Sequence, residues 1–508
     1  MIRVLLSILV LFMASRGIAG ETPHWLIDGK PTAQAAALFR TLAAADRDGL
    51  RAADYTINLS AAELRLVNSG RADATLQARY ESSLTASAAR YITHLTRGRV
   101  RAADAGFQFP TTQPFPDASA AVLDIARASD PESVLASLQP RPRPYQLLRK
   151  ALNDYRELAK DTSFTKLPAP PKRKLVVGDA YDGTSALRLL LIRLGDLGTD
   201  TAAADERHID AHTAAAIARF QARHGLLPDG VLGARTYAAL VTPMSQRVHQ
   251  IELAMERWRW LSAMPKPNIV INIPQFMLYA LPRPQDAEQS VIEMPVIVGT
   301  SDNRTPMFTA KIEQVIFQPF WDVPASIAKR ELLPKIRKDP GYMQRHHFEI
   351  VRGQSDDAMP VTPNQEAFDA LQAGRLRLRQ RPGPDNALGP VKFVLPNPYS
   401  VRLHGTSEPR LFERANREFS HGCIRVSEPA VLAEYVLRDA PGDWNSAAVD
   451  AALCGEKTLR VVLKRAVDVV VFYATATATE SRGVLFSEDI YGHDRTLDRL
   501  LARASTAR

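Results

Sequence analysis

The sequence contains very little cysteine: Cys423 and Cys454 are the only two thiols in 508 residues. Two cysteines cannot form the multi-disulfide framework that stabilises small secreted domains. They are 31 positions apart, so one disulfide between them is possible. Such a disulfide would leave Cys423 unable to act as a nucleophile. No metal site is expected, because the His421-x-Cys423 spacing is unusual for zinc and no second cysteine pair exists.

After its first 20 residues the sequence also lacks any apolar run that could span a membrane. The N-terminus has Arg3, an apolar run over 4–14 and small residues at 17–20, which is typical of a secretory signal peptide. The run is shorter than the roughly 20 residues of a spanning helix. We therefore expect residues 1–20 to be a cleaved signal, with an uncleaved membrane anchor as the alternative.

No strong excess of one charge is present: 64 Lys and Arg against 55 Asp and Glu give a net charge of +9, or +7 without Arg3 and Arg16. The basic residues are scattered, so a nucleic-acid partner is not expected for an exported protein. A positive field favours an anionic extracytoplasmic polymer instead. The composition, 45% hydrophobic and 23% charged, is that of a folded globular protein.

Apolar positions at helical spacing predict a helical scaffold domain over residues 21–165. The prolines and basic residues of KLPAPPKRK predict a linker over 166–177, because proline stops a helix. Residues 178–243 predict a compact helical module with a turn at Asp229-Gly230. This module has no cluster of residues suited to catalysis, so it is expected to be a small binding or packing module.

Runs rich in Val and Ile, bounded by Pro or Gly, predict β-strands from residue 268 onward. The runs are 268–281, 290–300, 311–323, 391–396, 399–405 and 458–478. Residues 325–385 interrupt these runs with two stretches that look helical, 326–347 and 364–380, and this insertion is expected to form a lid. The predicted fold class is therefore α+β and multidomain, with a β-rich, β-sandwich-like domain over 250–475, a helical lid insertion, and a C-terminal segment over 476–508.

The segment EFSHGCIRVS places Cys423 among polar and glycine residues. A thiol attacks as a thiolate, and with an unperturbed pKa of about 8.5 only about 3% is ionised at pH 7. A nucleophilic cysteine therefore needs a neighbouring histidine, which stabilises the thiolate and carries protons. An inert buried cysteine is the common alternative, but the residues around Cys423 are mostly polar, which is unusual for a buried, inert cysteine.

Two histidines can serve as the base: His404, in VRLHGTSEP, and His421. Side chains two positions apart on an extended segment share a face without pointing at each other, so His404, from another strand, is freer to meet the sulfur. The amides of Gly422 and Cys423 are candidates for an oxyanion hole. Arg425 is a candidate to hold a substrate carboxylate or the local turn.

The elements HGTSEP and SHGCIRV together resemble the catalytic signature of the YkuD-type L,D-transpeptidases. Other stretches, among them VIVGTSDNRTP, RPGPDNALGPVKFVLPN and GLRAADY, resemble the large Gram-negative, YcbB-like subgroup, so the resemblance covers nearly the whole mature chain. The module over 178–243 resembles the peptidoglycan-binding type 1 domain. The matching residues are Phe220-Gln221, Gly225-Leu226, Asp229-Gly230, Gly233 and Thr236. A scaffold that no longer binds glycan stays open for this module.

The resemblance implies that Cys423 is the acylated nucleophile and His404 its base, with the Gly405 carbonyl holding the imidazole in one tautomer. His421 and Gly422 would form the oxyanion site together with the nucleophile.

It also implies that Arg425 and Ser420 support the substrate pocket, and that Trp321 and Asn386 line or brace the cleft. The chain departs from the subgroup at 405–407, Gly-Thr-Ser where Asp-Thr-Pro is usual, and at Arg402, where an aromatic residue is usual.

The implied function is a periplasmic L,D-transpeptidase that needs no cofactor and forms 3-3 cross-links between diaminopimelate residues of peptidoglycan tetrapeptide stems. Its partners would be those stems, with other cell-wall synthesis proteins as further candidates, and carbapenems would acylate it. Lipoprotein tethering and D-amino-acid exchange stay open. The alternatives are a cell-wall peptide hydrolase and an inert wall-binding scaffold.

Overall fold

The computed structural model describes residues 22–109, 114–161, 163, 166–199, 207–283, 290–339 and 341–506. The expected signal peptide lies outside the described residues. Within them, no helix combines the length and the apolar character that crossing a membrane requires. The described residues up to Arg99, with Pro114–Arg141, form one compact unit, and those of 100–113 and 142–508 form a second.

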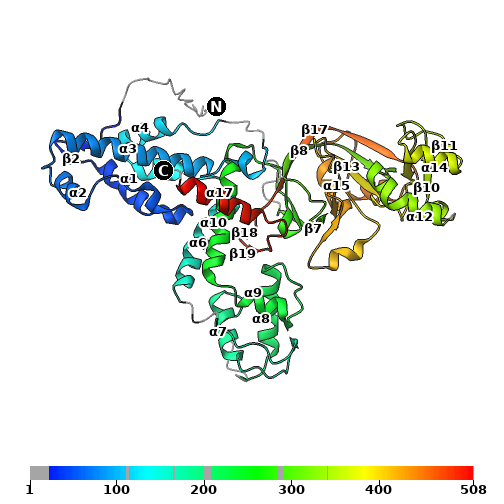
Figure 1. The fold of residues 1–508 in the computed structure, drawn as a ribbon, viewed down its shortest axis with the longest axis horizontal. Helices are drawn as coiled ribbons and strands as arrows, with labels where there is room; N and C mark the ends of the chain where they lie inside the picture. The colour runs from blue at the N-terminus through cyan, green and yellow to red at the C-terminus, as the bar shows by residue number, and fades with distance from the viewer. Residues whose placement is uncertain are drawn as a thin grey trace, which may run out of the picture. The chain divides into compact units, whose positions relative to one another are not determined.

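The first unit is a group of helices around the long helix α3 (Ala74–Arg97) (Figure 1). Asp73 begins this helix, because its carboxylate accepts a hydrogen bond from the Leu76 N–H at 2.8 Å. Trp25 is fully buried in the core of the unit and donates its indole N–H to Thr85 Oγ1 at 2.9 Å. The other elements are β1 (Leu26–Ile27), β2 (Lys30–Pro31), α1 (Ala33–Ala43), η1 (Ala45–Asp48), η2 (Ala52–Tyr55), α2 (Ala61–Asn68), α4 (Ala118–Arg127) and α5 (Pro131–Ser137).

This helical unit ends at Arg141, earlier than the boundary predicted at residue 165. The next helix, α6 (Arg143–Lys160), buries Tyr145 and Leu148 in the same core as α10 (Met244–Trp260) of the second unit. Its apolar stripe faces that core, so α6 belongs to the second unit.

The small module of the second unit is helical, as its sequence predicted. Gly195 and Asp210 mark the loop between its two main helices, since Asp210 caps the second one by accepting from the Thr213 N–H at 2.6 Å. The elements are β3 (Lys174–Leu175), α7 (Thr184–Arg193), α8 (Ala211–Arg223), β4 (Leu232–Gly233) and α9 (Ala234–Leu240).

The strand-rich domain is present as predicted, but its strands form one closed sheet and not the β-sandwich-like arrangement that was expected. The sheet order is β15-β7-β16-β14-β13-β8-β17-β5-β6, and β6 pairs with β7 as well as with β5. This second pairing closes the sheet around a core of Val, Ile, Leu and Phe side chains. The strands are β5 (Ile269–Asn272), β6 (Met277–Ala280), β7 (Ile292–Gly299), β8 (Phe308–Phe317), β13 (Val391–Val394), β14 (Leu403–His404), β15 (Glu418–Ser420), β16 (Ile424–Val426) and β17 (Leu459–Phe472).

The segment predicted as a helical lid is an insertion with a sheet and a core of its own. The prediction was wrong for part of it: α14 (Gln365–Gln372) is helical, but Arg377–Gln380 forms strand β12 at the centre of a four-stranded sheet. The other strands are β9 (Trp321–Asp322), β10 (Phe348–Val351) and β11 (Pro360–Val361), and the helices are α11 (Ala325–Ile327), the π-helix η7 (Ala328–Leu332), α12 (Leu333–Lys338) and α13 (Tyr342–Arg345).

The C-terminal segment is integrated into the second unit. Its hairpin, β18 (Ala476–Thr479) and β19 (Gly483–Phe486), shares a core with α6, and α17 (His493–Thr506) lies along α10 (Figure 1). Arg257 of α10 is fully buried and pairs with Asp494 of α17 at 2.5 Å. The remaining elements of the unit are η3 (Ala102–Ala105), η4 (Leu261–Ala263), η5 (Ile273–Gln275), η8 (Pro409–Glu413), α15 (Pro429–Leu437) and α16 (Ser446–Leu453).

Candidate active site

His404 is the last residue of the short strand β14, between β13 and β16. Its neighbour Leu403 is fully buried in the barrel core, so His404 faces the opposite, outer side of the sheet. His404 Nδ1 lies 2.7 Å from the Gly405 carbonyl oxygen. Because a carbonyl oxygen can only accept, Nδ1 carries the proton and Nε2 presents its lone pair.

Burial decides the charge of this imidazole. His404 is 5% exposed, and burial lowers its pKa from 6.5 to about 3, with a further lowering from the positive charge of Arg425. The side chain is therefore neutral at neutral pH. A neutral imidazole protonated at Nδ1 can accept a proton at Nε2.

Cys423 lies in the short connection between β15 and β16, and its side chain is half-buried. The next residue, Ile424, points into the barrel core and donates its N–H to the Arg402 carbonyl at 2.8 Å. Alternation along the chain therefore puts Cys423 on the outer face, which is also the face of His404. Cys423 and Cys454 are both free thiols, so the possible disulfide between them is absent.

Ser420 fixes the shape of this connection. Its hydroxyl donates to the Cys423 carbonyl at 2.5 Å and accepts from the Gly422 N–H at 3.1 Å. Ser420 is 4% exposed, so both hydrogen bonds are shielded from water. It braces the loop, and its hydroxyl is occupied within the protein.

Gly422 adopts a conformation that suits glycine, with φ of +103°. A Cβ there would also lie 3.4 Å from the Arg304 carbonyl oxygen. The Gly422 carbonyl accepts a hydrogen bond from Thr305 Oγ1 at 2.9 Å. The backbone before Cys423 is thus held from several sides.

Sequence reasoning missed two residues that support this loop, Thr305 and Tyr491. Thr305 is fully buried, and its hydroxyl also accepts from the Gly299 N–H at 2.9 Å. Tyr491 donates to the Gly299 carbonyl at 2.5 Å and accepts from the Thr305 N–H at 3.3 Å. The only signal for Thr305 was its place in the stretch VIVGTSDNRTP, and Tyr491 had none.

Arg425 holds the turn after the histidine. Its guanidinium donates to Glu408 Oε2 at 2.9 Å and to Thr406 Oγ1 at 3.4 Å. Of the two candidate roles, holding a substrate carboxylate or the local turn, this geometry favours the second, because Glu408 already supplies the carboxylate.

His421 turns toward the insertion. Its Nε2 lies 2.8 Å from Oε1 of Glu331, in the π-helix η7. The two side chains are 49% and 43% exposed. The second candidate base is therefore engaged by a carboxylate of the insertion.

Trp321 and Asn386 belong to the base of the insertion. Trp321 packs against Phe348 within its core, with ring centroids 6.1 Å apart. Asn386 is 1% exposed, and its amide donates to the Pro319 carbonyl at 3.0 Å while its oxygen accepts from the Leu388 N–H at 2.8 Å. Asn386 thus braces the backbone, the second of the two roles considered, and does not line a cleft.

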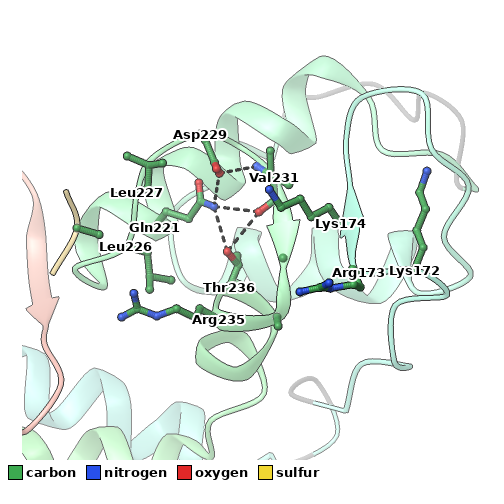
Figure 2. Close-up of a pocket in the computed structure, with 13 residues that line it drawn as sticks. Lys172, Arg173, Lys174, Gln221, Leu226, Leu227, Asp229, Val231, Arg235 and Thr236 are labelled. Atoms are coloured by element: carbon green, nitrogen blue, oxygen red, sulfur yellow. Dashed lines mark hydrogen bonds between the residues drawn. The ribbon is translucent and has the colours of Figure 1, made fainter. Parts of the chain in front are cut away.

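The small module contains a pocket of about 870 Å³. Figure 2 shows Gln221 donating to Asp229, the Val231 carbonyl and Thr236, at 2.9, 3.0 and 3.0 Å. Gln221, Thr236 and Phe220 are buried, so these signature residues hold the module together, although Gln221 and Thr236 also line the floor of the pocket. The exposed lining comes from other residues, among them Leu227, Arg235, Lys172, Arg173 and Lys174.

Comparison with known proteins assigns domains to these parts. Residues 266–450 match the L,D-transpeptidase catalytic domain, YkuD; residues 182–240 match a peptidoglycan-binding domain; and residues 18–152 match a family described as a scaffold domain. A curated protein of Haemophilus influenzae named "Putative L,D-transpeptidase" is 34% identical over 231 residues. That match covers 46% of this chain and 45% of the relative, so less than half of each protein is compared.

Proposed function

We propose that this chain, which carries an L,D-transpeptidase catalytic domain and a peptidoglycan-binding domain, is an extracytoplasmic enzyme that forms 3-3 cross-links in peptidoglycan. Cys423 is the nucleophile and His404 its general base. The observation that carries the proposal is the state of His404: it is buried and neutral, its Nδ1 is held by the Gly405 carbonyl, and it lies on the face of the sheet that also bears the thiol.

In the first half-reaction the donor is a tetrapeptide stem. The Cys423 thiol gives its proton to His404 Nε2 as sulfur bonds to the diaminopimelate carbonyl carbon. His404 then returns the proton to the departing D-alanine nitrogen as the C–N bond breaks, and a thioester remains. A neutral base at the start is what this transfer requires.

In the second half-reaction the side-chain amine of another stem attacks the thioester. The amine passes a proton to His404, the C–S bond breaks, and the sulfur takes that proton back. Attack by water on the same thioester gives only a trimmed tripeptide, so the outcome depends on which nucleophile reaches the acyl group.

The oxyanion of the tetrahedral intermediate needs N–H donors. The Gly422 N–H is already engaged with Ser420 Oγ at 3.1 Å. The amides of His421 and Cys423 are therefore the donors that we propose. Gly422 contributes the backbone conformation that turns its neighbours' amides.

The insertion is the proposed shield against water. It contacts the catalytic loop through Glu331 and His421, two residues from the nucleophile. Exclusion of water from an acyl-enzyme favours the amine.

The peptidoglycan-binding module is proposed to hold the polymer, through the exposed residues of its pocket. The basic residues Arg173, Lys174 and Arg235 suit an anionic peptide-bearing glycan.

Product analysis tests the proposal. Purified tetrapeptide stems are incubated with the protein and the products identified by mass. We expect cross-linked dimer with loss of D-alanine, and no product from Cys423→Ala. Tripeptide without dimer would make the protein a hydrolase, the second candidate, which the same acyl-enzyme permits. No product from the native protein would support an inert wall-binding scaffold.

A further inference from the structure

The outer face of the barrel beside His404 carries cationic side chains that the proposed steps do not use. Lys392 of β13 is the direct antiparallel partner of His404. Directly opposed residues of such a pair have their side chains on the same face, with Cβ atoms about 5 Å apart. Lys392 is thus the immediate neighbour of the proposed base.

Arg402 lies on the same face. Val401 and Leu403 on either side of it point into the core, with 5% and no exposure, so Arg402 and His404 point outward together. Its carbonyl binds the Ile424 N–H next to Cys423. Arg402 therefore lies at the proposed site, with its side chain on the side of both reacting groups.

Among the described residues, Lys392, Arg402, Arg425 and Arg460 are cations on this face, and the last two form salt bridges. Arg425 pairs with Glu408, and Arg460 pairs with Asp356 of the insertion. Within the described parts of the chain, Lys392 and Arg402 make no salt bridge and no side-chain hydrogen bond.

The positive charge of Lys392 is disfavoured where it stands. Burial, and then the neighbouring Arg402 and Arg460, lower its pKa to about 8, while Asp356 and Cys423 act in the opposite direction. An added carboxylate would relieve this repulsion. Arg402 also contributes to lowering the pKa of His404, so the same cations help to keep the base neutral.

The reaction supplies a carboxylate in this place. His404 must contact the nitrogen of the leaving D-amino acid in order to protonate it, and the α-carboxylate is separated from that nitrogen by one carbon atom. A group bound that close to His404 lies beside its strand neighbours Lys392 and Arg402.

We propose that Lys392 and Arg402 bind the C-terminal carboxylate of the donor stem, and so select donors whose scissile bond is the last peptide bond. The inference rests on the proposed function. It also assigns a role to Arg402, one of the positions at which this chain departs from the subgroup that it resembles.

Binding in a Cys423→Ala background tests the subsite without any turnover. Three tetrapeptide stems are compared by calorimetry: the free acid, the C-terminal carboxamide, and a stem amidated at the free carboxyl of diaminopimelate. Because a hydrogen bond to a charged group is worth about 1.5–3 kcal/mol, we expect the free acid to bind at least about 10-fold more tightly than the carboxamide. Amidation of diaminopimelate should have little effect.

Lys392→Met and Arg402→Leu should each weaken binding of the free acid by about 10-fold or more. Binding of the carboxamide should change by less than about 2-fold, so that the preference largely disappears. Lys464→Met, at an exposed lysine on strand β17 of the same barrel, is the matched control and should keep the full preference.

An unchanged preference in both variants, an equal loss for acid and carboxamide, or a preference that depends on the diaminopimelate carboxyl would each overturn the proposal. Failure of the proposed function is a separate result: the native protein would then give no product from any stem, whatever the Cys423→Ala protein binds.

Discussion

His421 Nε2 and Glu331 Oε1 are 2.8 Å apart, and this contact joins the residue two before the proposed nucleophile to the π-helix of the insertion. Short π-helical turns occur frequently at functional sites. Both side chains are nearly half exposed, and an exposed ion pair contributes only about 0–1 kcal/mol. A contact of that strength can open and close during turnover.

Glu331→Gln should therefore change the products more than the stability. We expect the ratio of cross-linked dimer to hydrolysed tripeptide to fall, because a loosened insertion admits water to the thioester. The unfolding free energy should change by less than about 0.5 kcal/mol. Asp369→Asn, which removes the Arg337–Asp369 pair inside the insertion, is the control. An unaltered product ratio in Glu331→Gln would show that the contact does not shield the acyl group.

Replacing His404, the proposed base, should slow acylation more than replacing His421, which contacts Glu331 of the insertion. His404→Ala should lower the acylation rate by about 10²–10⁴-fold, the usual contribution of general base catalysis. His421→Ala should have a milder effect, because the His421 backbone amide remains. Rates of acylation by a carbapenem measure both variants. If His421→Ala were the more damaging, the assignment of the base would be reversed.

The pH dependence of acylation reports the charge of His404. With its pKa lowered to about 3, the imidazole stays neutral as pH falls from 7 to 5, and the base is lost only near the lowered value. Acylation rates should therefore show no decline that titrates near 6.5. A decline with a midpoint near 6.5 would mean that His404 is not buried and neutral.

Gly422→Ala tests the loop that carries the nucleophile. An alanine at φ of +103° is strained, and it also approaches the Arg304 carbonyl. We expect a loss of about 1–2 kcal/mol in unfolding free energy and slower acylation. Gly353→Ala, at φ of +94° with open space around the new Cβ, is the matched control. It should lose comparable stability while keeping the acylation rate, and equal slowing in both would argue against a specific role of the loop.

The peptidoglycan-binding module is best tested by single substitutions. Deleting residues 178–243 would expose the core that it shares with α6 and α10. Leu227, a pocket residue that is 52% exposed, can be changed without that cost. Leu227→Asp should weaken co-sedimentation with isolated sacculi and leave turnover of small soluble stems unchanged. Undiminished binding would indicate that the module has a structural role.

The residues proposed for catalysis could be proposed from the sequence because they lie within short segments, 404–405 and 420–425. The strands could be predicted for the same local reason, since runs such as 292–299 and 459–472 are rich in β-branched residues.

Features that depend on contacts between segments far apart in the sequence could not be predicted. The closure of the barrel requires β6 to meet β7, and the membership of α6 depends on the core it contacts. Strand β12 (Arg377–Gln380) was predicted to be helical because it follows directly on the helical pattern of 365–372. The helix in fact ends at Ala373 and Gly374, before the strand begins.

The charged groups around His404 could not be predicted from the sequence either. The cation Lys392 lies in a strand that reads simply as VKFV, and only the register with His404 brings it to the site. The hydrogen bonds that the side chains of Ser420, Arg425 and Asn386 make were likewise not predictable, because spacing along the chain does not determine them.

The most direct test of the central claim is intact-mass analysis after incubation with a carbapenem, whose strained amide resembles the acyl donor. Cys423 should form one covalent adduct per chain, located by peptide mapping, and the exposed Cys454 should stay unmodified. Cys423→Ala should form none. An adduct on Cys454, or an unmodified native protein, would contradict the account of Cys423 as an activated nucleophile.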